Sequence, residues 1–402
     1  MKILLVSQYY HPERFKVTEL AEELFKRGYE VDVLTGLPNY PEGEILEDYK
    51  HGKNRNQVIN GVNVIRVPLI GRKTGKLYLS LNYLSYALNA SIKALFLHKE
   101  YDLVIVYQLS PILMALPAIV VKWTHKIPLV MYTFDLWPDS ITTLGIKQNS
   151  LFFKLVTNVS RWIYRKADVQ WVSSASFNVY LNRFTGLGKE IVHLPQYAED
   201  QFRLTPKIPQ KEFICLFAGN MGKAQSIETI LDAAKLLENE KDIRFELVGS
   251  GSDVDRLMDL ATSMALKNVH FAGSHPLEKM PDFYQEADVF LVTLFDDPVV
   301  SLTLPGKVQT YMASGRPIVG AVGGETAQVI RESQGGRVVA SGDSKGLAEQ
   351  ILYYCRNRDQ VRIDGENARN YYDLHFHKEQ FYDTILAQIE KIATRKENYV
   401  QK

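Results

Sequence analysis

Residues 213–237, FICLFAGNMGKAQSIETILDAAKLL, determine the fold of the second half of the chain. An apolar run predicts a buried strand, a turn with two glycines follows it, and apolar residues then recur at helical spacing. Gly219 and Gly222 allow a tight turn and a close approach of the backbone to a ligand. The helix directs its free N–H groups toward the same space. No third glycine follows, so the turn is neither a GxGxxG nor a Walker motif.

Strands and helices alternate along the whole chain, which favours parallel sheets with helices on both faces. In the second half we predict strands at 213–220, 244–250, 269–273, 289–294, 317–323 and 336–340. In the first half we predict strands at 2–8, 29–36, 62–70, 102–108, 128–135, 169–175 and 190–195. The pattern therefore predicts an α/β protein with two Rossmann-like, doubly wound units.

The length of the chain also favours two domains. At 402 residues and 46% hydrophobic composition, it exceeds the size at which one core usually stops growing. The polar, proline-rich segment 194–209 separates the two sets of strands as a linker or hinge would. We assign an N-terminal domain to 1–198, a linker to 199–209 and a C-terminal domain to 210–375. The last helix, 376–402, is expected to pack against the rest of the chain, because it has an apolar stripe of Phe381, Ile385, Ile389 and Ile392.

Cysteine content and hydropathy exclude several classes of protein. Cys215 and Cys355 cannot build a disulfide framework and have no partners at metal-ligand spacing, so a reducing cytoplasm is expected. The N-terminal MKILLVSQYY has too short an apolar run for a signal peptide and is typical of a first strand. The most apolar later run, 111–121, covers about half of a bilayer and contains two prolines. We therefore expect no transmembrane segment.

Charge is distributed unevenly, although the formal net charge is only +1. Residues 49–99 contain nine Lys and Arg residues and no Asp or Glu, interleaved with aromatic and aliphatic side chains. This composition suits a surface that lies on anionic lipid headgroups. Nucleic acid is the competing partner, but the chain has no recognition motif, so we expect none. The other alternative is a helix packed into the domain, whose core face would consist of Leu81, Leu84, Leu88 and Ile92.

The stretch 304–320, LPGKVQTYMASGRPIVG, places a lysine in the first turn of a helix that follows a Pro-Gly turn. A cation is unfavourable there, because the positive end of the helix dipole lies at the same point. An anionic ligand such as a phosphate would explain Lys307, and the alternative is that it points into water. Gly249 and Gly251 also follow a strand of the same predicted sheet, at the edge where open α/β sheets bind ligands. Together with the turn at Gly219 and Gly222 and the helix start at Lys307, this loop would enclose a nucleotide diphosphate.

The first half supplies acidic and polar candidates. Asp135 follows a buried strand, so partial desolvation should raise its pKa, and helix capping is the alternative. The segment SQYYHPERF follows the first strand and contains His11, Glu13 and Arg14, and NYPEG at 39–43 follows the second strand. Asp296 and Asp297 invite a metal interpretation. We expect solvated turn residues instead, because no His or third acid is near them and a proline follows.

These motifs together resemble glycosyltransferase family 4 over nearly the whole chain. The segments that carry the resemblance are QYYHPE, LPNYPEG, YTFDLWPDS, LPQYAED, FAGNMGKAQS and LPGKVQTYMASGRPIVG. The resemblance implies the GT-B fold, in which two Rossmann-like domains face each other across a cleft and a C-terminal helix returns to the first domain. The motifs look closest to a bacterial polysaccharide branch that includes N-acetyl-L-fucosamine transferases of O-antigen and capsule synthesis.

The resemblance implies a metal-independent, retaining transfer of a sugar from a UDP-sugar. The acid-free segment 49–99 indicates that the acceptor is a lipid-linked (undecaprenyl-diphosphate) saccharide, because an enzyme that works on a membrane-held diphosphate gains from a basic, aromatic surface. The sugar would be an N-acetylated hexosamine such as N-acetyl-L-fucosamine, and no cofactor beyond the donor is implied. The enzyme would be cytoplasmic and peripheral on the inner face of the plasma membrane. A UDP-sugar 2-epimerase of similar two-domain fold and a non-catalytic nucleotide-sugar-binding protein remain alternatives.

The sequence departs from the family pattern in the residues that hold the donor. Two glutamates, which usually contact the ribose and the donor sugar, are replaced by Leu302 and Thr310, and the usual Arg and Lys on the diphosphate by Asn220 and Gln225. The resemblance assigns catalysis to Asp135, Lys307 and Glu13. It assigns donor binding to Gly219, Asn220, Gly222, Lys223, Gln225, Gly249, Gly251, Ser274, His275, Pro305, Gly306 and Thr310. It assigns acceptor binding to His11, Arg14, Asn39, Tyr40, Arg72 and Lys73, and no residue to a metal.

Overall fold

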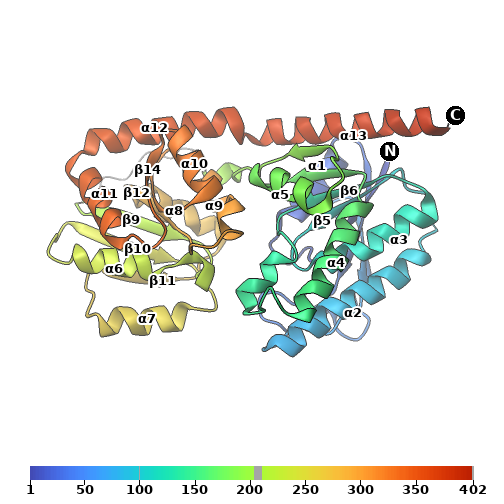
Figure 1. Ribbon diagram of the computed structural model, residues 1–402, viewed down its shortest axis with the longest axis horizontal. Helices are drawn as coiled ribbons and strands as arrows, with labels where there is room; N and C mark the ends of the chain where they lie inside the picture. Colours follow the sequence, from blue (N-terminus) through green and yellow to red (C-terminus); the bar gives the residue numbers. More distant parts are fainter. Residues whose placement is uncertain (99, 203–210, 401–402) are drawn as a thin grey trace. The chain divides into compact units, whose positions relative to one another are not determined.

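The chain divides into two α/β units (Figure 1). The computed structural model describes residues 1–98, 100–202 and 211–400. Unit 1 comprises 1–173, 177–194 and 387–402, and unit 2 comprises 174–176 and 195–386. The chain therefore passes between the units four times, at 173/174, 176/177, 194/195 and 386/387.

Unit 1 is built on an eight-stranded sheet with the order β3-β4-β2-β1-β5-β6-β7-β8. The strands are β1 (Lys2–Val6), β2 (Glu30–Gly36), β3 (Asn56–Ile59), β4 (Val62–Val67), β5 (Leu103–Gln108), β6 (Leu129–Thr133), β7 (Val169–Val172) and β8 (Ile191–His193). Neighbouring strands are parallel except β3 and β4. The seven predicted strands are confirmed. Strand β3 was not predicted, because it is short and lies at the sheet edge with two exposed residues.

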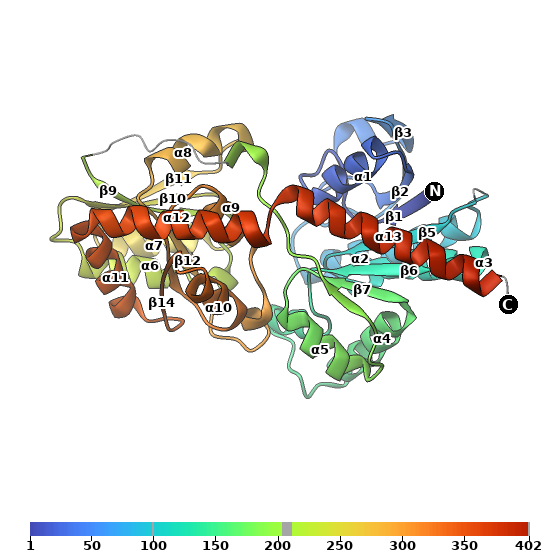
Figure 2. The same ribbon diagram turned by 90° about the horizontal axis from the view of Figure 1, so that it is seen from above.

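The helices of unit 1 are α1 (Lys16–Lys26), α2 (Lys76–Leu95), α3 (Leu116–His125), α4 (Leu151–Lys166) and α5 (Ser176–Thr185). In Figures 1 and 2, α2 and the second half of α13 (Lys378–Val400) lie on opposite faces of the sheet. Helix α3 packs against both α2 and α4.

Helix α2 does not have the core face that the sequence allowed as an alternative. Its buried residues are small or polar, apart from one tyrosine: Asn82, Tyr86, Ala87, Ala90 and Ala94. Leu84, Leu88 and Ile92 are exposed instead. The helix therefore packs into the domain, as this alternative held, but the predicted core face is wrong, because Leu84, Leu88 and Ile92 are exposed.

Unit 2 is built on a six-stranded, fully parallel sheet with the order β11-β10-β9-β12-β13-β14. The strands are β9 (Phe213–Ala218), β10 (Ile243–Val248), β11 (Val269–Gly273), β12 (Val289–Thr293), β13 (Ile318–Ala321) and β14 (Gly336–Val339). All six were predicted. The helices are α6 (Glu228–Leu236), α7 (Val254–Ser263), α8 (Met280–Glu286), α9 (Gly306–Ala313), α10 (Gly324–Glu332), α11 (Ser344–Arg356) and α12 (Arg358–His375).

The core of unit 2 consists of two apolar layers, one on each face of its sheet. Phe217 belongs to one layer, and Leu216, the neighbouring residue on β9, belongs to the other. This arrangement follows from the alternation of side chains along a strand that is buried on both faces. The continuous apolar run of β9 is thereby explained.

The segment after β8 differs from the predicted linker 199–209. Residues 195–202 belong to unit 2, and Phe202 is buried in its core against Tyr284, with ring centroids 4.8 Å apart. The rest of the predicted linker, 203–210, lies outside the described residues. The first part of the segment is therefore packed structure, which sequence composition alone did not indicate.

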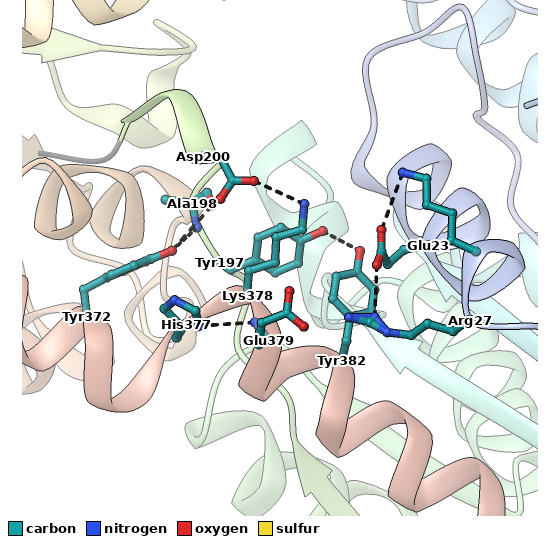
Figure 3. Close-up of polar contacts among 11 residues, drawn as sticks. Glu23, Arg27, Tyr197, Ala198, Asp200, Tyr372, His377, Lys378, Glu379 and Tyr382 are labelled. Atoms are coloured by element: carbon teal, nitrogen blue, oxygen red, sulfur yellow. Dashed lines mark hydrogen bonds and ion pairs between the residues drawn. The ribbon is translucent and has the colours of Figure 1, made fainter. Parts of the chain in front are cut away.

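Two tyrosines of the C-terminal helices hold this segment (Figure 3). The Tyr382 hydroxyl lies 2.6 Å from the hydroxyl of Tyr197, and the Tyr372 hydroxyl accepts a 3.2 Å hydrogen bond from the backbone N–H of Ala198. Lys378 Nζ lies 3.7 Å from a carboxylate oxygen of Asp200. The start of α13 therefore belongs to unit 2.

The rest of α13 belongs to unit 1. Ile389 and Ile392 are buried there, and Lys391 forms an ion pair with Glu190. Phe381 and Ile385, the earlier members of the predicted apolar stripe, are buried in unit 2. The expectation that this helix packs rather than extends freely is confirmed. The point where the chain enters unit 1 is inside the helix, between 386 and 387, and not at 376.

Candidate functional site

The strongest candidate in unit 2 is the start of α9. Pro305 directly precedes the helix with φ −64 and ψ 136, and no side chain caps this end. The first N–H groups of a helix lack intrahelical partners and carry the positive end of its dipole. Lys307 lies in this first turn, as the sequence predicted. The site combines backbone donors with a cation, as an anion site requires.

The environment of Lys307 is uncharged and largely apolar. Its Nζ atom donates a 2.7 Å hydrogen bond to Gln225 Oε1 and lies 3.8 Å from the centroid of the Phe217 ring. Burial lowers the pKa of Lys307 to about 7. Among the described residues, no carboxylate lies within ion-pair distance of this amine. An anionic ligand would therefore supply the missing counter-charge.

Gly219 brings the turn after β9 against the same lysine. It has φ +137, and a Cβ built there would lie 3.2 Å from Lys307 Nζ. Gln225 ends the short helical turn Lys223–Gln225 that follows. Gly219, Gln225 and Lys307, all predicted to bind the donor or act in catalysis, are thus brought together at one edge of the sheet.

Gly249 and Gly251 have a packing explanation that the sequence analysis did not consider. A Cβ at Gly249 would lie 1.9 Å from the carbonyl oxygen of Gly219, and one at Gly251 would lie 2.5 Å from the carbonyl carbon and oxygen of Met221. The Met221 N–H also donates a 2.8 Å bond to the carbonyl of Ser250. Glycine is needed here because two backbone loops touch, so these residues shape the site and need not contact a ligand.

The remaining donor-binding candidates of unit 2 lie around the same sheet edge. Asn220 and Lys223 are exposed, and Gly222 lies between them. Thr310 Oγ1 donates to the carbonyl of Gly306 at 3.2 Å, one turn earlier in α9. This internal bond uses the only proton of the hydroxyl, so Thr310 can offer a ligand only an acceptor while it persists.

Ser274 and His275 follow β11 at this edge. Ser274 is exposed, whereas His275 Nε2 lies 3.0 Å from the carbonyl oxygen of Ala272, and its ring packs against Phe283 with centroids 4.9 Å apart. The carbonyl accepts, so Nε2 carries the proton and Nδ1 is left as an acceptor in the neutral ring. His275 is therefore held in one orientation.

Unit 1 places Asp135 in a defined hydrogen-bond chain directly after β6. The Ser110 hydroxyl donates to Asp135 Oδ2 at 2.6 Å, and Trp137 Nε1 donates to Ser110 Oγ at 3.0 Å. Because an indole N–H can only donate, the single hydroxyl proton of Ser110 is directed to the carboxylate. Burial raises the pKa of Asp135, as predicted, and the Ser110 bond opposes this shift. The helix-capping alternative is not realised, since the following helical turn begins at Asp139 after Pro138.

Glu13 has a different environment from the one its assignment to catalysis implies. Its Oε1 accepts 2.8 Å bonds from the N–H groups of Asn39 and Tyr40, and its Oε2 accepts a 3.3 Å bond from Tyr10. Burial raises the pKa of Glu13 to about 7, although these N–H groups and Arg66 oppose the shift. Oε1 therefore joins the loop after β1 to the loop after β2, and Oε2 forms a bond within the loop after β1. The geometry therefore favours a positioning role.

Of the predicted acceptor-binding residues, one is used inside the protein and the others are at least partly exposed. The Asn39 side chain is used internally, because its Oδ1 accepts from the Arg72 N–H and from Asn82 Nδ2, both at 3.1 Å. Tyr40 is partly exposed, and the Arg72 guanidinium lies 5.5 Å from its ring centroid. The other predicted residues lie at the surface: His11, Arg14 and Lys73.

The structure adds residues that the sequence analysis missed. Tyr9 stacks on Phe15 with ring centroids 4.9 Å apart, and it lies close to Tyr83 of α2. Burial raises the pKa of both tyrosines, and the charge of Asp135 raises that of Tyr83 further. Ser110 was also missed. It follows β5 at the same edge as Asp135, and this position after a neighbouring strand was the available signal.

Metal-ligand candidates are absent from the described part of the chain, where no group of three His, Cys, Asp or Glu side chains is placed to hold an ion. Asp297 Oδ1 accepts from the N–H groups of Val299 and Val300, at 2.8 and 3.1 Å. It is thus a turn residue, as predicted.

Two protein-family models match the chain. One, described as "Glycosyl transferase 4-like domain", matches residues 15–195, and the other, described as "Glycosyl transferases group 1", matches residues 212–357. The model for each half is therefore a glycosyltransferase model. The chain is a glycosyltransferase with the GT-B fold.

Curated relatives of this glycosyltransferase are distant in sequence. The glycosyltransferase WbjE of Pseudomonas aeruginosa is 26% identical over 61% of the chain and 64% of its own length, slightly under two thirds. The colanic acid biosynthesis glycosyl transferase WcaI of Escherichia coli (strain K12) is 24% identical over 78% of the chain and 82% of its own length.

Solved structures share the GT-B fold with this glycosyltransferase. A sucrose-phosphate synthase from Thermosynechococcus elongatus superposes with a TM-score of 0.80 at 18% identity, covering 98% of this chain and 99% of the other. Anabaena HepE in complex with UDP and glucose gives 0.70 at 15% identity, covering 97% and 99%. At these identities the likeness concerns the fold alone.

The glycosyltransferase has no carboxylate at the two positions where the resemblance placed glutamates. Leu302 ends a short helical turn, and Thr310 lies in the middle of α9. A further finding concerns its helices: none within the described ranges is long and apolar enough to cross a membrane.

Proposed function

We propose that this glycosyltransferase transfers a sugar, with retention of configuration, from a UDP-sugar to a lipid-linked (undecaprenyl-diphosphate) saccharide in bacterial surface polysaccharide synthesis. The observation that carries the donor part is Lys307, an ammonium group at a helix start with only a neutral hydrogen-bond partner. The names of two similar proteins are in keeping with the proposal, since one complex contains UDP and another protein is assigned to colanic acid biosynthesis.

In this proposal the diphosphate of the donor lies at the start of α9. The bond from the anomeric carbon to the diphosphate oxygen breaks, and its electron pair leaves with the diphosphate. Lys307 and the helix N–H groups stabilise the negative charge that develops. They replace the arginine and lysine that the family pattern places where Asn220 and Gln225 occur. No metal ion and no further cofactor are required.

The acceptor part of the proposal concerns unit 1. The acceptor hydroxyl attacks the oxocarbenium-like sugar on the face that the diphosphate leaves, and its proton passes to a departing phosphate oxygen. Asp135 is the proposed carboxylate that stabilises the positive charge on the sugar. The hydrogen bond from Ser110 supports this role, because it holds the carboxylate in one orientation. Glu13 contributes by holding the loops that carry Tyr10 and Tyr40.

The finer parts of the proposal rest on the resemblance and on composition. The donor sugar is proposed to be an N-acetylated hexosamine such as N-acetyl-L-fucosamine, as in the O-antigen and capsule branch. The enzyme is proposed to lie at the inner face of the plasma membrane, in contact with anionic lipid through residues 49–99. This segment contains nine basic and no acidic residues.

A thermal-shift screen against nucleotide sugars tests the donor part, because a ligand that binds only the folded state raises the unfolding midpoint. We expect UDP and a UDP-sugar to raise the midpoint of the wild-type protein and to have a much smaller effect on Lys307→Met. Equal shifts for both proteins would contradict the proposed diphosphate site.

Incubation of the donor with and without a lipid-linked saccharide tests the reaction. Transfer of the labelled sugar only when the acceptor is present supports the proposal. An isomeric UDP-sugar formed without acceptor would favour an epimerase. Tight donor binding without any product would favour a non-catalytic nucleotide-sugar-binding protein.

A further inference from the structure

Helices α2, α3 and α4 expose an unusual amount of apolar surface. Of the 25 large hydrophobic residues that are exposed within the described chain, 12 belong to these helices or to the cap of α2. They are Leu77, Tyr78, Leu84, Leu88, Ile92, Leu95, Phe96, Trp123, Leu151, Phe152, Leu155 and Trp162. This concentration distinguishes the three helices from the rest of the surface, where such residues are scattered.

The exposed residues form stripes and are not randomly placed on the helices. On α2, Leu77, Leu84, Leu88 and Ile92 recur at intervals of seven, four and four residues, which places them on one side of the helix. On α4, Leu151, Leu155 and Trp162 recur at intervals of four and seven. A soluble helix usually directs such a stripe into the core, and here both stripes point away from it.

A pair of tryptophans joins α3 to α4. Trp123 and Trp162 lie with ring centroids 6.1 Å apart, nearly at right angles. Lys166 Nζ lies 5.5 Å from the first ring and 5.2 Å from the second. Helix α3, which carries Trp123, also packs along α2, so the three helices are contiguous. Tryptophan and lysine side by side are typical of the interface between water and lipid headgroups.

The charge of the three helices has one sign. Their sequences contain seven Lys and Arg residues and no Asp or Glu. The basic residues are Lys76, Lys93, Lys122, Lys154, Arg161, Arg165 and Lys166. Lys122 forms an ion pair with Asp168, which follows α4. An apolar surface bordered by positive charge matches an anionic bilayer better than a second copy of this chain, which would bring like charges together.

We infer that α2, α3 and α4 form a docking face that inserts its exposed apolar side chains into the interface of an anionic membrane. The inference deepens the membrane partner of the proposed function: it extends the contact from residues 49–99 to α3 and α4 and assigns the binding to named side chains. The first turn of α2 also lies beside proposed acceptor residues, because Lys73 Nζ lies 5.2 Å from the Tyr78 ring centroid. A docked face would therefore bring the acceptor loops of unit 1 to the lipid surface.

Vesicle binding by the full-length protein tests the inference without any transfer reaction, so its failure is distinguishable from failure of the proposed activity. We expect sedimentation with vesicles that contain phosphatidylglycerol and weaker sedimentation with phosphatidylcholine alone. Leu88→Glu and Leu155→Glu, at 63% and 61% exposure, should each weaken binding by about tenfold or more, since a charge replaces an inserted side chain. Leu374→Glu, at 68% exposure on α12, is the matched control and should bind as the wild type does.

The tryptophans provide a second readout. The chain has four, and Trp137 and Trp171 are buried, which leaves Trp123 and Trp162 as the exposed ones. Brominated lipid should quench their fluorescence on binding, and a Trp123→Phe, Trp162→Phe double variant should lose that quenching while it still sediments.

Three outcomes would overturn the inference. The first is a wild-type protein that stays in the supernatant with anionic vesicles at low salt. The second is equal loss of binding in Leu374→Glu and in the two stripe variants. The third is a stable dimer in solution that Leu88→Glu and Leu155→Glu dissociate, because the face would then be an interface between copies.

Discussion

The ammonium group of Lys307 donates a 2.7 Å hydrogen bond to the side-chain oxygen of Gln225 and has Phe217 on another side. A glutamine leaves the amine without a counter-charge, whereas a carboxylate would have neutralised it. Lys307 comes from α9 and Gln225 from the short helical turn after β9, 82 positions apart in the chain. Their pairing keeps a cation available at a helix start.

Loss of Lys307 should slow turnover strongly. We expect Lys307→Ala to lower kcat by roughly a hundredfold, which is the usual effect of removing one charge-stabilising donor. Lys345→Ala is the matched control, because Lys345 also lies in the first turn of a helix, α11, but is exposed and has no assigned role, so its effect should be much smaller. Steady-state kinetics with a fixed acceptor would measure both. An unchanged kcat in Lys307→Ala would remove this residue from the mechanism.

Donor affinity should depend on pH through the same amine. Its pKa is lowered to about 7 by burial in the free protein, and a bound diphosphate favours the charged form and raises that pKa. Binding therefore takes up a proton above pH 7, and the affinity for UDP should fall by up to about tenfold for each further pH unit. Calorimetry over a pH series would measure this. Lys307→Met should bind UDP weakly, and its affinity should not fall with pH in this way. If the affinity of the variant falls as that of the wild type does, another group causes the pH dependence.

Removal of the Ser110 hydroxyl should change the titration of Asp135. The Ser110 bond opposes the rise in the pKa of this carboxyl, so Ser110→Ala should raise the pKa further. The acidic limb of the pH–rate profile should then move to higher pH, because more alkaline solution is needed to ionise Asp135. Ser110→Thr keeps the hydroxyl and should retain the wild-type limb. A lower rate with an unmoved limb would reduce Ser110 to a purely structural role.

Stability should depend on pH through Glu13. Its pKa in the folded state, about 7, is raised above the ordinary value of 4.5. A raised carboxyl pKa favours folding in the protonated form, so this contribution is present below pH 4.5 and is lost as the pH rises through 7. Compared with Glu13→Gln, the wild-type protein should lose unfolding free energy across this window. Denaturant titrations at several pH values would measure the unfolding free energy of both proteins. If it changes with pH in the same way in both, Glu13 is not the group responsible.

Gly249 should tolerate substitution poorly. Gly249→Ala would place a Cβ 1.9 Å from the carbonyl oxygen of Gly219 at φ +143, so both strain and overlap oppose it. Gly28→Ala is the matched control, because Gly28 also has positive φ, +92, but a Cβ there meets nothing within 4 Å. We expect a clearly larger drop in the thermal midpoint for Gly249→Ala. Equal drops would mean that backbone strain alone accounts for the requirement.

Most of the fold could be predicted from the sequence because most of its strands are buried on both faces. Such strands are continuous apolar runs, and each was found, whereas the partly exposed edge strand β3 was missed. Helix α2 shows the limit of periodicity. The spacing of Leu84, Leu88 and Ile92 indicated one face of a helix but not whether that face packs inward.

For the candidate site, the sequence could predict where a residue lies along a helix or strand but not which side chains and loops surround it. The position of Lys307 at a helix start followed from the Pro-Gly turn and is confirmed. The environments of Glu13 and Asn39 could not be predicted, because their partners come from other loops that only the folded chain brings near. Ser110 was missed for the same reason, since its bond to Asp135 joins residues 25 positions apart.

Helix α13 has a consequence for engineering. Because residues up to 386 complete one unit and residues from 387 complete the other, neither unit is encoded by an uninterrupted segment. A chimera that exchanges the first 194 residues with those of a relative would leave Ile389 and Ile392 facing a foreign surface. Recombination that preserves folding must therefore transplant the end of the chain together with its beginning.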